Sequence, residues 1–206
     1  MEFSKYIVPI YIGDEYRGNG FIVNSYLVLP YHLIKIEPNN WEVHESFNYR
    51  YGGITYREKL VNSIVKQGDK EDTSDNPDLA RDLLVFRTNI INSDLVISLE
   101  YDTNDNCIYY GYNEEDKSLT TVIKAMGKIH QQKAVLKVNE LPVEIGNCMT
   151  CICKLRPGNS GGIVCQGDNI IGMFIRDQSF VSGTFQSVFI KASYIMQVIE
   201  DKVGRF

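Results

Sequence analysis

Residues 156–162 of this 206-residue chain read RPGNSGG, the most informative stretch of the sequence. A serine nucleophile must project from a tight turn, beside backbone N–H groups that can stabilise an oxyanion. Gly158 and Gly161 suit such a turn, because glycine accepts positive φ and close backbone approach. The same letters also fit an ordinary hairpin loop. The rest of the chain favours Ser160 as a nucleophile.

A serine hydroxyl becomes a strong nucleophile when a base removes its proton, and that base is usually a histidine. The chain has three histidines. His32 follows an apolar, strand-like run at residues 20–29, whereas His44 lies among charged residues and His130 in a polar stretch. We therefore predict that His32 is the base.

A buried carboxylate usually orients the catalytic histidine, and we expect it at the start of a buried strand. Two candidates, Asp78 and Asp82, precede the apolar run at residues 83–87. Arg81 interrupts the apolar letters that follow Asp78, whereas an unbroken run follows Asp82. The pattern predicts Asp82 as the orienting carboxylate, with Asp78 as the alternative.

Residues 18–32 read GNGFIVNSYLVLPYH, and with the chain order His32, Asp82, Ser160 they resemble the chymotrypsin-like serine proteases. The GNSGG motif is similar to the Deg-type branch, while LPYH and the IGM at residues 171–173 are similar to some viral members. The resemblance spans nearly the whole chain. Subtilisin-like and α/β-hydrolase proteins carry their triads in other orders.

This resemblance implies an all-β fold of two antiparallel six-stranded barrels that form one peptidase unit. Residues 1–112 would carry the histidine and the aspartate, and residues 113–206 the nucleophilic serine. The implied activity is that of a trypsin-like serine endopeptidase, which needs no cofactor or metal. The N–H groups of Gly158 and Ser160 would form the oxyanion hole. The strand that would line the specificity pocket and pair with an extended substrate comprises Gly172, Met173, Phe174 and Ile175.

Hydrophobic patterning supports this fold class independently. Short apolar or alternating runs recur between turn signals, which is typical of sandwiches and barrels. Residues 193–203 carry apolar side chains at helical spacing and predict a short C-terminal helix. The polar stretch at residues 67–77 predicts an exposed loop. The predicted strands lie at residues 6–12, 20–29, 83–87, 95–99, 119–123, 134–138, 148–154, 162–165, 170–175 and 187–190.

Several positions depart from the pattern of this family. Asn159 stands where digestive relatives carry an aspartate that pairs with a newly cut N-terminus, so we expect no such activation. Residues 30–31, Pro-Tyr, replace the usual small residues before the histidine. Lys154 and Phe174 replace the residues that would select basic or glutamine side chains, so neither preference is expected. No PDZ-type domain follows, so a complete Deg-type stress protease is not expected.

The composition of the chain bears on which partners it can bind and on its compartment in the cell. The net charge of −5 gives no basic footprint for nucleic acid or an anionic membrane. No apolar run approaches a membrane span, and the first residues do not form a secretory signal. The odd number of cysteines favours a reducing compartment, so we predict a cytoplasmic protein. We expect buried thiols rather than a zinc site at Cys107, Cys148, Cys151, Cys153 and Cys165.

Three functional hypotheses fit these residues. The first is an active endopeptidase with protein or peptide substrates. The second is a catalytically silent module of the same fold that binds an extended peptide or a partner protein. The third is an esterase without peptide preference. The charged stretch at residues 67–77 lies near Asp82 and is a candidate element for a regulatory partner.

Overall fold

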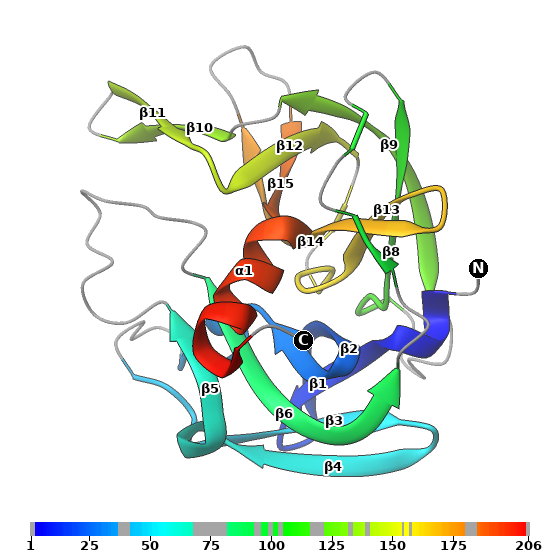
Figure 1. Ribbon diagram of the computed structural model, residues 1–206, viewed down its shortest axis with the longest axis vertical. Helices are drawn as coiled ribbons and strands as arrows, with labels where there is room; N and C mark the ends of the chain where they lie inside the picture. The colour runs from blue at the N-terminus through cyan, green and yellow to red at the C-terminus, as the bar shows by residue number, and fades with distance from the viewer. Residues whose placement is uncertain are drawn as a thin grey trace.

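The computed structural model describes residues 3–36, 42–67, 82–92, 96–98, 101–102, 105–115, 122–131, 134–138, 141–153, 155–156, 158–179 and 185–204. Within these ranges the chain forms two large β-sheets and a separate two-stranded hairpin, almost entirely antiparallel, and ends in one α-helix (Figure 1).

The first sheet contains six strands in the order β4-β3-β1-β2-β6-β5. Its longest strand, β2, pairs with β1 on one side and with β6 on the other. The strands are β1 (Ile7–Ile12), β2 (Glu15–Leu29), β3 (Ser46–Tyr51), β4 (Ile54–Lys59), β5 (Ser63–Gln67) and β6 (Leu83–Asn92).

The second sheet closes into a six-stranded barrel, because β13 pairs with both β8 and β14. The two-residue strand β7 (Val96–Ile97) adds to β14 in parallel, and β10 (Ala134–Val138) with β11 (Leu141–Ile145) forms a separate hairpin. The barrel strands are β8 (Asn106–Gly111), β9 (Ile123–Gln131), β12 (Cys148–Ile152), β13 (Ile163–Gln166), β14 (Asn169–Ser179) and β15 (Phe185–Lys191).

The predicted fold class is confirmed: the protein is mainly β, in two six-stranded units followed by a short helix. The strand β8, which the sequence-based division put in the first half, pairs within the second sheet. The division into residues 1–112 and 113–206 stays a prediction. The predicted loop lies outside the described residues beyond Gln67, which ends β5.

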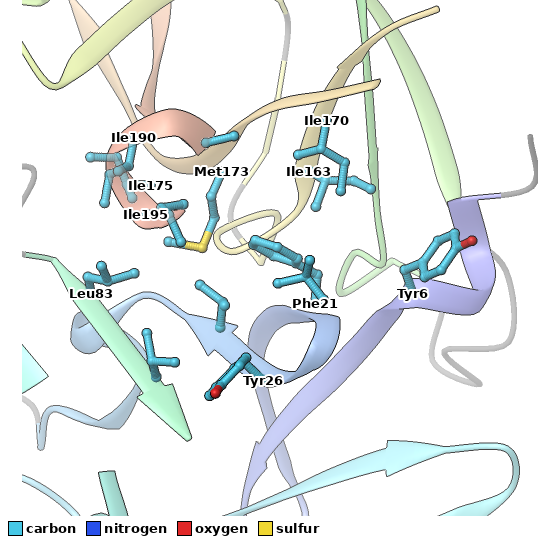
Figure 2. Close-up of a cluster of buried hydrophobic side chains, with 14 of the residues drawn as sticks. Tyr6, Phe21, Tyr26, Leu83, Ile163, Ile170, Met173, Ile175, Ile190 and Ile195 are labelled. Atoms are coloured by element: carbon cyan, nitrogen blue, oxygen red, sulfur yellow. The ribbon is translucent and has the colours of Figure 1, made fainter. Parts of the chain in front are cut away.

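Each sheet encloses a core, and a third core lies between the sheets. The third core receives Phe21 and Leu83 from the first sheet and Met173 and Ile175 from the second. Figure 2 shows these side chains converging from the two sheets. Neighbouring residues on β2, β6 and β14 enter the other two cores, because successive strand side chains point to opposite faces. The two sheets therefore share one apolar interface.

The helix α1 (Ala192–Val203) spans this interface and contacts β5 of the first sheet as well as β14 and β15 of the second (Figure 1). Its buried residues include Ile195, Val198 and Ile199, at helical spacing. The sequence predicted this helix to within one residue at its start. None of the helices in the described part of the chain has the length and apolar character needed to cross a bilayer.

Candidate active site

His32 lies directly after the end of β2. Pro30 is extended, with φ −66° and ψ 139°, and its missing N–H ends the ladder of the strand. The chain then enters a 3₁₀ turn, Tyr31–Ile34, in which Tyr31, Leu33 and Ile34 are buried. These anchors fix the turn and leave the His32 side chain 36% exposed.

Asp82 meets His32 because β2 and β6 are antiparallel neighbours. Leu29 pairs with Leu84, so the residue before β6 lies beside the turn after β2. The Asp82 carboxylate contacts His32 twice, with its Oδ2 2.6 Å from the ring Nδ1 and its Oδ1 accepting the backbone N–H at 2.8 Å. An ionised carboxylate only accepts hydrogen bonds, so Nδ1 carries the proton and Nε2 is left as an acceptor.

The surroundings of Asp82 keep its carboxyl group ionised. Burial alone would raise the pKa of the Asp82 carboxyl. The electrostatic attraction to His32 and the two hydrogen bonds from it, helped by Lys35, outweigh burial and hold the pKa of Asp82 below its usual value. Asp82 is therefore ionised at neutral pH and fixes the orientation of the imidazole.

The loop that carries Ser160 depends on two glycines in the left-handed region. Gly158 has φ +84° and Gly161 has φ +85°. A Cβ on Gly161 would also clash with the backbone carbonyl of Asn19 on β2. The Ser160 hydroxyl donates to the backbone carbonyl of Ile175, at an Oγ–O distance of 3.1 Å. The nucleophile loop is thus pressed against both sheets.

One cavity of about 320 Å³ is lined by three of the predicted site residues, His32, Gly158 and Ser160. Its polar wall includes an Arg17–Glu15 ion pair with an N–O distance of 3.3 Å. A larger cavity, about 560 Å³, lies along β3, β4 and β5 and contains no predicted site residue. The smaller cavity is lined by Glu15, Tyr16, Arg17, His32, Leu33, Glu114, Gly158 and Ser160.

The predicted oxyanion-hole donors are the backbone N–H groups of Gly158 and Ser160. Within the described part of the chain, neither N–H donates to a backbone carbonyl. The carbonyls of the same two residues are held instead. Asn19, which is fully buried, donates its backbone N–H to the Ser160 carbonyl at 2.7 Å, and its amide lies 3.2 Å from both carbonyls. The Tyr16 hydroxyl donates to the Gly158 carbonyl at 2.7 Å.

Asn159 is also held by hydrogen bonds, and only 1% of it is exposed. Its side-chain oxygen accepts the Arg156 N–H at 2.7 Å, and its side-chain nitrogen donates to the Tyr112 carbonyl at 3.1 Å. The Tyr109 hydroxyl donates to the Asn159 backbone carbonyl at 2.7 Å. A neutral amide thus occupies the position directly before the predicted nucleophile.

Sequence reasoning missed Tyr16, Asn19 and Tyr109, because their partners lie 50 to 142 residues away. One local signal existed for Asn19, since a polar residue between Gly18 and Gly20 is unusual at the start of an apolar strand. The two tyrosines carry no comparable signal in the sequence.

The predicted substrate-pairing strand lies inside the sheet for most of its length. Gly172 and Met173 pair with β13 on one side and β15 on the other. The N–H of Phe174 donates to Gly162, and its carbonyl accepts from Gly161. Of the four predicted residues, Ile175 alone lies beyond both the β13 pairing and the hydrogen bonds to Gly161 and Gly162. Past it, the described strand pairing of β14 is with β15 alone.

The other two histidines do not line this cavity. His44 is half-buried beyond the His32 turn, and His130 is exposed near the end of β9. The alternative carboxylate Asp78 lies outside the described residues, and so does Lys154, the residue that argued against a preference for basic side chains. All five cysteines are free and buried, as predicted. Within the described ranges, no group of three or more His, Cys, Asp or Glu side chains could hold a metal ion.

Comparison with known proteins identifies the fold. No protein-family model matches the chain, and no curated protein matches it by sequence. Among solved structures, mouse neuropsin, a serine protease, aligns with a TM-score of 0.68 at 14% identity, over 98% of this chain and 96% of that one. The active form of the Rv3671c protease from Mycobacterium tuberculosis aligns with a TM-score of 0.66 at 12% identity, over 99% of this chain and 83% of its own.

Tobacco etch virus protease bound to product gives a TM-score of 0.66 at 10% identity, over 99% of this chain and 80% of that one. These three structures come from a mammal, a bacterium and a plant virus, so the likeness extends across very distant sequences. At such identities the likeness concerns the fold. The chain has the two-barrel fold of the chymotrypsin-like proteases.

Proposed function

We propose that this protein is a serine endopeptidase that hydrolyses peptide bonds through an acyl-enzyme intermediate. The observation that carries the proposal is the two-point contact between His32 and Asp82, at 2.6 and 2.8 Å, beside a cavity that Ser160 also lines. Such a contact sets the tautomer that a general base needs. The chymotrypsin-like fold supports the same assignment by analogy.

In the proposed reaction, His32 Nε2 takes the proton of Ser160 as Oγ attacks the scissile carbonyl. The N–H groups of Gly158 and Ser160 stabilise the oxyanion that forms. His32 then protonates the leaving amine, and the acyl-enzyme is hydrolysed by water that the same imidazole activates. Asp82 stays ionised throughout and stabilises the imidazolium.

The substrate would bind as an extended strand along β14. Because Gly172, Met173 and Phe174 are already paired, the pairing edge begins at Ile175 rather than at Gly172. The Ile175 carbonyl, which now accepts from Ser160, would accept an N–H from the substrate. A protein or peptide partner is therefore the proposed substrate class, while a regulatory partner and a cytoplasmic location stay predictions.

One observation favours the second candidate, a silent module that binds an extended peptide. The Ser160 hydroxyl donates to Ile175, and no hydrogen bond joins it to His32 although both residues are described. An active enzyme must turn this hydroxyl toward Nε2 when substrate occupies the Ile175 carbonyl. A silent module would leave the serine where it is.

Labelling with a fluorophosphonate separates these candidates, because the probe bonds only to an activated serine. We expect covalent labelling of the wild-type protein and none of Ser160→Ala or His32→Ala. Cleavage of a peptide library by wild type, with Ser160→Ala as control, would then establish endopeptidase activity. Hydrolysis of simple esters without any peptide cleavage would point to an esterase, and absence of labelling would establish the silent module.

A further inference from the structure

We propose that the Tyr109 hydroxyl is a positioning group for the oxyanion hole, acting on the peptide bond that joins Asn159 to Ser160. This inference rests on the proposed peptidase function. It concerns a residue of β8 that lies 50 positions before its partner in the sequence.

The geometry links the hydroxyl to the N–H of Ser160. Tyr109 donates to the Asn159 carbonyl at 2.7 Å, in a buried hydrogen bond. In a trans peptide, the carbonyl and the N–H of the next residue point in opposite directions across one rigid plane. A donor that holds the Asn159 carbonyl therefore also sets the direction of the Ser160 N–H. The Gly162 N–H adds a weaker contact to the same carbonyl at 3.2 Å.

The hydrogen bonds made by Tyr16 and Asn19 act on other peptide planes. The Gly158 carbonyl is held by Tyr16, and the Ser160 carbonyl by Asn19. Those carbonyls belong to the peptide planes before and after the one that carries the Ser160 N–H. Among the side chains that the structure describes, only Tyr109 donates to the plane in question.

The barrel provides a fitted space for the Tyr109 side chain. A Cβ on either Gly111 or Gly162 would clash with its phenol oxygen. Its ring packs edge-on against Phe174, with centroids 6.0 Å apart at 84°. Only 1% of Tyr109 is exposed. Burial raises the pKa of the phenol well above its usual value, so the hydroxyl keeps its proton and acts as a donor.

The test compares Tyr109→Phe with wild type in the hydrolysis of p-nitrophenyl acetate and in the rate of fluorophosphonate labelling. Both reactions develop charge in the oxyanion hole. We expect kcat and the labelling rate to fall about 10-fold, the scale of one hydrogen bond, with KM nearly unchanged. Tyr110→Phe is the matched control, because Tyr110 is the next residue of β8 and packs in the core between the sheets. It should leave all three values unchanged.

Three results would overturn the inference. One is a Tyr109→Phe protein with wild-type kcat. The second is an equal kcat loss in Tyr110→Phe. The third is a kcat loss in Tyr109→Phe that is accompanied by an equal rise in KM. Either of these two would indicate a general packing defect. If Tyr109→Phe does not fold, Gly111→Ala, which displaces the phenol without removing it, must give the same kcat-selective loss. A wild-type protein that neither labels nor hydrolyses overturns the proposed function itself.

Discussion

The Ser160 hydroxyl donates to the carbonyl of Ile175 at 3.1 Å, so the nucleophile is docked on the strand that would bind the substrate. Occupation of that carbonyl by a substrate N–H would release the hydroxyl toward His32. Under the proposed function, substrate binding would therefore be coupled to alignment of the serine.

Ser160→Ala tests how much the Ser160 hydroxyl contributes to stability and whether it is the nucleophile. The change removes one hydrogen bond at a half-buried position, so the free energy of unfolding should fall by about 1 kcal/mol or less. Fluorophosphonate labelling and peptide cleavage should be lost completely. Chemical denaturation and labelling assays measure the two effects. A large loss of stability would mean that the serine has a structural role that this geometry does not reveal.

Asp82→Asn should lower turnover by orders of magnitude while leaving the fold intact. An amide that donates to Nδ1 would stabilise the wrong tautomer of His32, a change worth about 10⁴-fold in the reference triad. Steady-state kinetics on any substrate of the wild type would measure the loss. Asp78→Asn is the control, since Asp78 was the alternative carboxylate. If that variant were inactive and Asp82→Asn active, the assignment would be reversed.

The same carboxylate predicts how stability depends on pH. The folded protein holds the pKa of Asp82 below its usual value, so the unfolded chain binds a proton more readily. The stabilisation is complete above about pH 5 and is lost as pH falls through about 4 toward the folded pKa. Unfolding free energies measured from pH 6 to pH 2 should fall less steeply in Asp82→Asn. Asp14→Asn, at an exposed turn, should keep the wild-type slope.

The three proposed catalytic residues could be picked out from the sequence because each stands beside a strong local pattern. His32 follows an apolar strand, Asp82 precedes another, and Ser160 lies among glycines. The strands β3 and β4 were not predicted, because they alternate tyrosines with charged residues, and much of β4 is exposed. The roles of Tyr16 and Tyr109 in holding the serine loop could not be predicted, because their hydrogen bonds join residues that only the folded barrels bring together.

The substrate edge shows a second limit of sequence reasoning. A strand sequence does not reveal which of its residues already have two neighbours. From the sequence, Gly172, Met173 and Ile175 are equally good candidates for a free strand edge. Only the pairing with β13 separates the first two from the third. The substrate-binding role of the four residues stays a prediction, and the strand pairing puts a free edge at Ile175 rather than at Gly172.

Asn159→Asp should destabilise the nucleophile loop. The Asn159 side-chain nitrogen donates to the Tyr112 carbonyl, and a carboxylate oxygen there would face that carbonyl in a buried site. The expected cost is about 2–3 kcal/mol, with reduced fluorophosphonate labelling. Asn106→Asp, at an exposed position on β8, is the control and should be nearly neutral. A variant with wild-type stability would show that no neutral amide is needed at this position.

Gly161→Ala and Gly13→Ala separate the two reasons for a glycine. Both positions have positive φ, +85° and +59°, so both alanines bear the strain of the left-handed region, about 1–2 kcal/mol. Only the Gly161 methyl group meets other atoms, the Asn19 carbonyl and Pro30, whereas nothing lies within 4 Å of a Cβ on Gly13. Urea denaturation should therefore show an extra loss of about 1–3 kcal/mol for Gly161→Ala. Equal losses for the two variants would mean that β2 and the serine loop are not in close contact in solution.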